Sequence, residues 1–423
     1  MKTIQSALLC AVLVAATSFY INPRKDAGKV YQYINGNWFN GQSFEQKTMY
    51  VHSGFFLETA PATIDSVIDL GNQFVIPPFG EAHTHMLEGI GNVDERINNY
   101  LKHGVFYVKN PNNVREWTRS LFGKLNKPTS VDGSFANGGI TSTGGHPQIL
   151  YEEVIIQHLK GAIPDIEKSW FRNKAFFNAN SEQELQAIWP VIMADKPDFI
   201  KAYLANSEEF GKAQAPSKYV LRKGLDPKLL KAIVAKAHSA GLRVSAHVET
   251  AADFRSALDA RVDEINHTPG FYIFSSDVAS RYELTASDAK RAANQRTTVV
   301  TTLLSRDLIE DRSLLPLAKS IQAKNLQLLH KHGVAIAIGS DHSDLPVHEM
   351  NALMELKIFD NLTLLKMWTE NTAATIFPKR KIGHLKPGYE ASFLVLKNNP
   401  LHSFTSKPDI AMMIKQGRVL RVR

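Results

Sequence analysis

The sequence is poor in cysteine, lacks an obvious membrane-spanning run and contains no low-complexity tract. A single cysteine, Cys10, among 423 residues excludes a disulfide framework and any zinc or iron–sulfur site built on cysteine within one chain. A metal site would therefore use His, Asp, Glu or Lys side chains. With 44% apolar and 21% charged residues, the composition is that of a globular protein and excludes a disordered or fibrous one.

Excess positive charge is absent from most of the chain, although the formal net charge is +8. Residues 379–423 hold ten Lys and Arg side chains against two acidic ones, which accounts for the whole excess. No basic helix with interleaved aromatic residues and no nucleic-acid-binding signature accompanies this charge. We therefore expect a solvated C-terminal face and no nucleic-acid partner.

The N-terminus has the pattern of a secretory leader. Lys2 precedes an apolar stretch from Ala7 to Ala16, and the small polar pair Thr17-Ser18 follows. A transmembrane helix needs about 20 apolar residues, and this run is shorter. We expect residues 1–18 to be a signal peptide, the protein to be exported (periplasmic or secreted), and no stable membrane span to remain. An uncleaved N-terminal segment that anchors the chain is the alternative.

Short apolar runs broken by turn residues occupy both ends of the chain. Between residues 29 and 74, Asn35-Gly36 separates two such runs and predicts a hairpin. Residues 391–396 and 410–415 predict two further strands, and Gln416-Gly417 predicts a turn into the last strand. Two strand-rich ends thus flank a central region of different character.

The central region alternates strand-like and helix-like segments. A helix from Asp226-Pro227, closed by Gly241, shows the pattern best, because an N-cap, a proline at the first helical position and a C-terminal glycine all agree. Further segments are strands at 243–247, 262–267 and 334–339 and helices at 250–260 and 315–332. Such units over about 300 residues predict a parallel α/β sheet closed into a (β/α)8 TIM barrel. A doubly wound sheet is the alternative, which no G-x-G-x-x-G or Walker sequence supports.

Five glycines lie between Asp132 and Pro147. This composition predicts a loop that approaches a ligand. A phosphate-binding loop is excluded, since no Gly-Lys-Ser/Thr opens a helix after it.

Chemically active residues end several of the predicted strands. The strand from Phe74 runs into His83-Thr84-His85, and residues two apart in an extended chain face the same side. Four further residues each terminate an apolar strand at its carboxyl end, where the active sites of barrels converge: Lys201, His247, His267 and Asp341.

This arrangement resembles the metal-dependent amidohydrolase superfamily over nearly the whole chain, and is most similar to its dipeptidase and prolidase-like members. The terminal segments resemble the composite β-sandwich of that family. The resemblance implies a sandwich formed by residues 19–75 and 383–423, and a barrel hydrolase domain at residues 76–382.

The resemblance also implies a binuclear metal centre. Two divalent ions, zinc or alternatively manganese, would be bound by His83, His85, Lys201, His247, His267 and Asp341. Lys201 would be carboxylated and would bridge the ions, because a carbamate presents two oxygens and a negative charge. A metal-bridging hydroxide would attack the substrate, and Asp341 would pass its proton to the leaving group.

His146 and Tyr203 are the candidate substrate-binding residues. A loop histidine that caps local backbone and a core tyrosine are the respective alternatives. Glu81 stands where the family usually has Asp, and Lys109-Asn110 stands where it commonly has Arg-Asp. None of these departures is a metal ligand, so they concern the substrate.

We expect a hydrolase that cleaves an amide or ester bond of a small substrate, such as a dipeptide or an N-acyl amino acid. Three alternatives stay open. The first is a lactonase or phosphotriesterase, which would use the same metal centre. The second is a mononuclear deaminase, in which Lys201 would not bind metal. The third is a binding protein with an inactive barrel. A homo-oligomer is compatible with the sequence.

Overall fold

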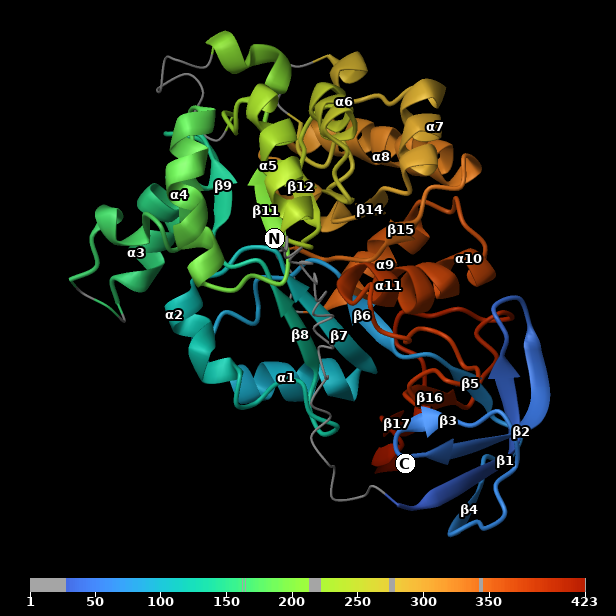
Figure 1. Cartoon of the computed structure of the whole chain (residues 1–423). Helices are drawn as coiled ribbons and strands as arrows, with labels where there is room; N and C mark the ends of the chain where they lie inside the picture. Colours follow the sequence, from blue (N-terminus) through green and yellow to red (C-terminus); the bar gives the residue numbers. More distant parts are fainter. Residues whose placement is uncertain are drawn as a thin grey trace, which may run out of the picture.

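The computed structural model describes residues 28–161, 163, 165–212, 222–273, 278–341 and 345–422. The chain folds into an α/β barrel and a β-rich domain to which both ends of the chain contribute (Figure 1). The expected leader at residues 1–18 lies outside the described residues. Within the described part of the chain, no helix is long and apolar enough to cross a membrane.

The barrel consists of short parallel strands that pair in chain order. One group pairs β6, β7 and β8, and a second pairs β9, β11, β12, β13, β14 and β15, with β10 on the outer side of β9. The bounds are β6 Phe79–Glu81, β7 Val105–Asn110, β8 Asp132–Phe135, β9 Gly139–Thr141, β10 Phe176–Asn178, β11 Ile200–Tyr203, β12 Val244–His247, β13 Glu264–Asn266, β14 Thr298–Val300 and β15 Ile336–Ala337.

Backbone hydrogen bonds close this ring. Strands β8 and β9 follow each other directly and act as one interrupted strand, and the amide of Asp198 donates to the carbonyl of Phe135 at 2.9 Å. At the other gap, between β15 and β6, the amide of Ala82 donates to Ile338 at 2.8 Å. Eight strand positions therefore surround one core, and the predicted (β/α)8 barrel is confirmed.

Helices cover the outside of the barrel (Figure 1). Helix α5 begins at Pro227 as predicted, because the Asp226 side chain accepts from the amide of Lys228, and it ends at Ser239 before Gly241. Helix α6 starts with a capping box between Thr250 and Asp253. The helix bounds are α1 Val93–Lys102, α2 Arg115–Thr118, α3 Ile156–Leu159, α4 Glu182–Ala194, α5 Pro227–Ser239, α6 Ala251–Ala260, α7 Ala286–Gln295, α8 Leu315–Lys331, α9 Pro346–Glu355, α10 Asn361–Lys366 and α11 Thr372–Ile376.

The two ends of the chain form one sheet with the order β18-β17-β16-β5-β1-β2-β3, and β4 pairs with β1. Strand β5 joins the ends, since Val75 pairs with Val395 of β16. Trp38 packs against Phe56 and Phe393 in its core, with ring centroids 5.8 and 5.1 Å apart. The composite β-domain expected from both ends is confirmed, while the domain limits at residues 75 and 383 stay a prediction. The bounds are β1 Val30–Phe39, β2 Phe44–His52, β3 Phe55–Phe56, β4 Ser66–Asp69, β5 Phe74–Ile76, β16 Phe393–Leu396, β17 Ile410–Lys415 and β18 Arg418–Val422.

The hairpin predicted at Asn35-Gly36 is wrong. Strand β1 continues through this pair, and its register against β2 shifts there, so the pair forms a β-bulge. Asn35 has a φ of 55°, and a Cβ on Gly36 would lie 2.6 Å from the Trp38 indole nitrogen. Asn35 has the positive φ that an Asn-Gly pair favours, but this conformation occurs inside a strand, where Gly36 packs against Trp38.

The loop predicted between Asp132 and Pro147 is only partly present. Strands β8 and β9 occupy residues 132–135 and 139–141, and the remaining residues of this stretch lie outside strands. Its approach to a ligand stays a prediction. A Cβ on Gly139 would lie 2.3 Å from the Tyr203 ring of β11. The glycine content therefore reflects backbone contact around β9, beside the strand that carries Lys201.

Candidate metal centre

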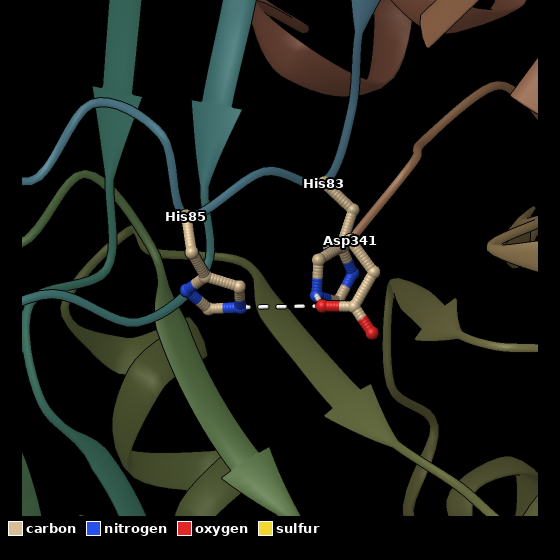
Figure 2. Close-up of side chains that lie close together, drawn as sticks. All are labelled: His83, His85 and Asp341. Carbon is tan, nitrogen blue, oxygen red and sulfur yellow. Dashed lines mark ion pairs between the residues drawn. The ribbon is translucent and has the colours of Figure 1, made fainter. Parts of the chain in front are cut away.

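Three candidate ligands meet where β6 and β15 end. His83 and His85 follow β6, and Asp341 follows β15 (Figure 2). The Oδ1 atom of Asp341 lies 3.4 Å from Nε2 of His83 and 3.4 Å from Nε2 of His85. One ligand atom from each of the three residues lies within 4.8 Å of the other two. This spacing brings the three donor atoms close enough to share one ion.

Two further histidines extend this cluster across the barrel mouth. His247 ends β12 and His267 follows β13, and their ring centroids are 4.4 Å apart. The ring of His267 is 5.0 Å from that of His83. The Nδ1 atom of His267 lies 4.0 Å from Asp341 Oδ2. Four imidazoles and one carboxylate therefore gather at the carboxyl ends of the barrel strands.

Lys201 lies deeper in the barrel, on β11, and is buried. Its Nζ atom contacts the Oδ1 atom of Asn266 and lies 5.0 Å from the centre of the Tyr203 ring. Burial lowers the pKa of Lys201 to about 7. The role of Lys201 as a ligand stays a prediction, since the closely spaced trio consists of His83, His85 and Asp341.

His146 and Tyr203 lie beside this cluster. The His146 ring is 5.0 Å from the His247 ring and 5.1 Å from the Tyr203 ring, and Tyr203 is 5.5 Å from His247. Both side chains are thus adjacent to the candidate ligands. Their contact with a substrate stays a prediction.

Hydrogen bonds select which imidazole nitrogens face the centre. Nδ1 of His85 lies 3.0 Å from the backbone carbonyl of Asn112, which only accepts, so Nδ1 carries a proton and Nε2 is the nitrogen that faces the centre. Nδ1 of His267 lies 2.6 Å from the Thr302 hydroxyl, which can donate or accept. The Nδ1 atom of His83 is buried and has no hydrogen-bond partner among the described residues. The other ring nitrogen, Nε2, is the one that faces Asp341 Oδ1.

The protonation of the cluster also fits metal binding. Burial lowers the pKa of His83 to about 4 and that of His247 to about 3, so both imidazoles are neutral at pH 7 and offer a lone pair. Burial raises the pKa of Asp341, but His83 and His85 outweigh this effect and hold it well below its usual range. Burial opposes charge on His85, yet hydrogen bonds to Asp341 and Glu88 raise its pKa to about 10. Metal binding at His85 would displace that proton.

Two of the candidate ligands have a strained backbone. The φ angles are 75° at His267 and 62° at Asp341, in the left-handed region that disfavours residues with a side chain. Each such residue costs about 1–3 kcal/mol, and residues of this kind cluster at functional sites. Position 339 also requires a glycine, because a Cβ at this position would lie 2.7 Å from the Cβ of His83.

Glu81 holds the ends of β6 and β15 together, a role that the sequence reasoning missed. Its carboxylate accepts from the amide of His83 at 2.9 Å, the amide of Ser340 at 3.0 Å and the Ser340 hydroxyl at 2.6 Å. Glu81 thereby fixes the segments that carry His83 and Asp341. The alternation Glu81-x-His83 on one strand face was the signal that could have revealed it.

Asn266 and Ser305 were also missed. Ser305 donates to Asp341 Oδ2 at 3.1 Å, and Asn266 contacts Lys201. Ser305 lies 36 residues from Asp341 in the sequence and Asn266 lies 65 residues from Lys201, so no local pattern shows either contact.

Glu249, two residues after His247, lies 3.5 Å from its Nε2 atom. The same carboxylate accepts from Asn206 at 2.9 Å. Burial raises the pKa of Glu249 to about 8. Glu249 therefore borders the candidate centre from the β12 side.

Comparisons with known proteins agree with this geometry. The sequence model described as the amidohydrolase family matches residues 137–422. A solved amidohydrolase structure has 17% sequence identity and a TM-score of 0.70, covering 93% of this chain and 100% of the other. A. niger ochratoxinase has 15% identity and a TM-score of 0.70, covering 94% and 97%. A Xaa-Pro dipeptidase with bound methionine in its active site has 16% identity and a TM-score of 0.69, covering 92% and 99%.

A comparison with curated protein sequences found no match. The structural likenesses, all well below 25% identity, establish the fold. The family match spans more than half of the chain. The chain therefore belongs to the amidohydrolase family, and the protein is an enzyme that hydrolyses amide bonds.

Proposed function

We propose that the enzyme is metal-dependent and cleaves a dipeptide or an N-acyl amino acid. The observation that carries this proposal is the gathering of His83, His85 and Asp341, with His247 and His267 beside them, at one end of the barrel. Imidazole nitrogens and carboxylate oxygens suit Zn²⁺ and Mn²⁺. Solved structures of similar fold are a Xaa-Pro dipeptidase and a prolidase complexed with N-methylphosphonate-L-proline, which supports a dipeptide-like substrate.

Two zinc ions, or manganese ions as the alternative, would be held by His83, His85, Lys201, His247, His267 and Asp341. Lys201 would take part as a carbamate, because an amine has no second donor atom with which to bridge two ions. Burial lowers the pKa of Lys201 to about 7, so a substantial fraction of this side chain is neutral amine at neutral pH. The neutral amine is the form that reacts with CO2.

Bound ions would acidify a water molecule and polarise the scissile carbonyl. Asp341 would accept the proton of the attacking water and deliver it to the leaving amine. The Ser305 hydroxyl holds Asp341 Oδ2 at 3.1 Å, so the carboxylate keeps one orientation. His146 and Tyr203 would contact the substrate from their places beside His247.

A substrate panel tests this proposal. The purified full chain, supplied with Zn²⁺ or Mn²⁺, should hydrolyse dipeptides or N-acyl amino acids and leave lactones and phosphotriesters intact. Asp341→Asn should lower kcat at least about 100-fold, because it removes a proton-transfer group. Asp409→Asn, which alters only a surface ion pair with Lys397 in the β-domain, should leave kcat unchanged. Turnover confined to lactones or phosphotriesters would contradict the substrate class.

We also propose that the protein is exported and that residues 1–18 are removed. The mature chain would then comprise residues 19–75, 76–382 and 383–423 as the two β-domain segments and the barrel between them. N-terminal sequencing of protein recovered from its native host should start near Phe19. A start at Met1 would contradict cleavage.

A further inference from the structure

We propose that Asn266 is a positioning residue that orients Lys201 as a metal ligand, an inference that rests on the function proposed above. Lys201 on β11 and Asn266 on β13 are both buried inside the barrel. The Nζ atom of Lys201 donates to the Oδ1 atom of Asn266. This contact lies one residue before the candidate ligand His267.

The orientation of the Asn266 carboxamide is fixed by its partners. Its Nδ2 atom donates to Glu264 Oε1 at 2.9 Å, and its Oδ1 atom accepts from the Ser245 hydroxyl at 2.8 Å. Because the Glu264 carboxylate only accepts hydrogen bonds, the NH2 group must face Glu264 and the oxygen must face Lys201. The carboxamide therefore presents one defined acceptor to the lysine nitrogen.

Glu264 is itself held in place. Lys109 donates to both of its carboxylate oxygens, at 2.7 and 2.8 Å, and the Ser245 hydroxyl shares its single proton between Glu264 Oε1 and Asn266 Oδ1, each 2.8 Å away. The interior of a TIM barrel is ordinarily packed with branched apolar side chains. Here a connected set of buried polar groups replaces them, and such a set is tolerated only when its members are bonded to one another. Through Asn266, this set of polar groups is hydrogen-bonded to the Nζ atom of Lys201.

Carboxylation preserves the contact with Asn266. The lone pair of the neutral Lys201 amine bonds to the carbon of CO2, one C–O π pair moves to oxygen, and one N–H proton leaves to solvent. The carbamate keeps a single N–H. In the planar carbamate this N–H and the carboxylate point to different sides of the nitrogen. Donation of the N–H to Asn266 therefore turns both oxygens away from Asn266 and fixes the carbamate plane.

The experiment measures the carbamate itself. The full chain with Zn²⁺ is equilibrated with ¹³C-bicarbonate at a series of concentrations, and the lysine carbamate carbon is followed by ¹³C NMR. Asn266→Leu keeps the branched shape of the side chain without the acceptor. We expect it to raise the bicarbonate concentration for half-formation at least tenfold, and Ser245→Ala to raise it by a smaller factor.

Asn325→Leu is the matched control. Asn325 is another buried asparagine, whose Nδ2 atom donates to the carbonyls of Pro269 and Tyr282. Loss of its hydrogen bonds should lower thermal stability and leave carbamate formation unchanged. Wild-type half-formation in Asn266→Leu would overturn the role of Asn266. If Asn266→Leu does not fold, wild-type half-formation in Ser245→Ala would overturn it. A wild-type protein without any carbamate signal would overturn the bridging lysine and this inference with it.

Discussion

Lys109 donates to both carboxylate oxygens of Glu264, at 2.7 and 2.8 Å, inside the barrel. The two residues are 4% and 1% exposed and lie on β7 and β13, 155 residues apart in the sequence. On β13, Glu264 lies two residues before Asn266, which contacts Lys201. The Asn266 side chain also donates to Glu264, so the ion pair is connected to the candidate ligand Lys201.

Removing one partner of this pair should be costly. Glu264→Gln leaves the Lys109 ammonium buried without a counter-charge, and breaking such a pair costs about 3–5 kcal/mol of unfolding free energy. Urea unfolding at pH 7 measures the loss. The control is Glu283→Gln, which breaks the exposed pair with Lys324 and should cost less than about 1 kcal/mol. Equal small losses in both variants would show that the buried pair does not support the fold.

Acid should destabilise the protein through the same carboxylate. Burial raises the pKa of Glu264, but Lys109 outweighs this effect and brings the pKa to about 2, below the ordinary value of 4.5. The charged form therefore stabilises the folded state above pH 4.5, and this contribution is lost as the pH falls from 4.5 towards 2. Unfolding measured stepwise over that interval should show a steeper decline for wild type than for Glu264→Gln. Parallel curves would contradict this assignment.

Glu81 should control metal affinity without touching the metal. Glu81→Ala removes the acceptor shared by the His83 amide and Ser340, which frees the segments on which His83 and Asp341 lie. Loss of such a supporting contact lowers metal affinity about 10–100-fold. Chelator competition with Zn²⁺ measures this loss. Glu81→Gln keeps one acceptor oxygen and should lose less metal affinity. An unchanged affinity in Glu81→Ala would show that Glu81 does not support the metal ligands.

The Tyr203 hydroxyl should act on substrate binding. Tyr203→Phe keeps the ring beside His247 and removes one hydrogen-bonding group, which is worth about 0.5–1.5 kcal/mol. KM should therefore rise about 2- to 12-fold while the bound metal stays constant. Tyr33→Phe, a buried tyrosine of the β-domain, is the control and should leave KM unchanged. If KM stays constant in Tyr203→Phe as well, Tyr203 is a packing residue.

Local patterns revealed much of this architecture. The start of α5 was predictable from Asp226-Pro227, since a cap and a proline act within one helical turn. The convergence of His83 and Asp341 followed from their places at strand ends, because parallel strands of one barrel end on the same side. The extent of the strand ending at Gly339 was not predictable, as only Ile336–Ala337 pair as a strand.

Contacts between distant segments were not visible in the sequence. Lys109 was noted only as a departure from the family pattern, because its partner Glu264 belongs to a strand on the other side of the barrel. The Asn35-Gly36 bulge was misjudged for a similar reason. Its geometry is set by Trp38 and Leu70 packing beneath it, which the turn propensity of the pair does not encode.

The proposed function requires six side chains that hold two divalent ions, with Lys201 between them. The zinc content per chain tests this directly, measured by mass spectrometry after gel filtration of the full-length protein and of Lys201→Ala. We expect two ions per chain in wild type and at most one in Lys201→Ala, with both proteins folded. A single ion in wild type that Lys201→Ala retains would contradict this expectation.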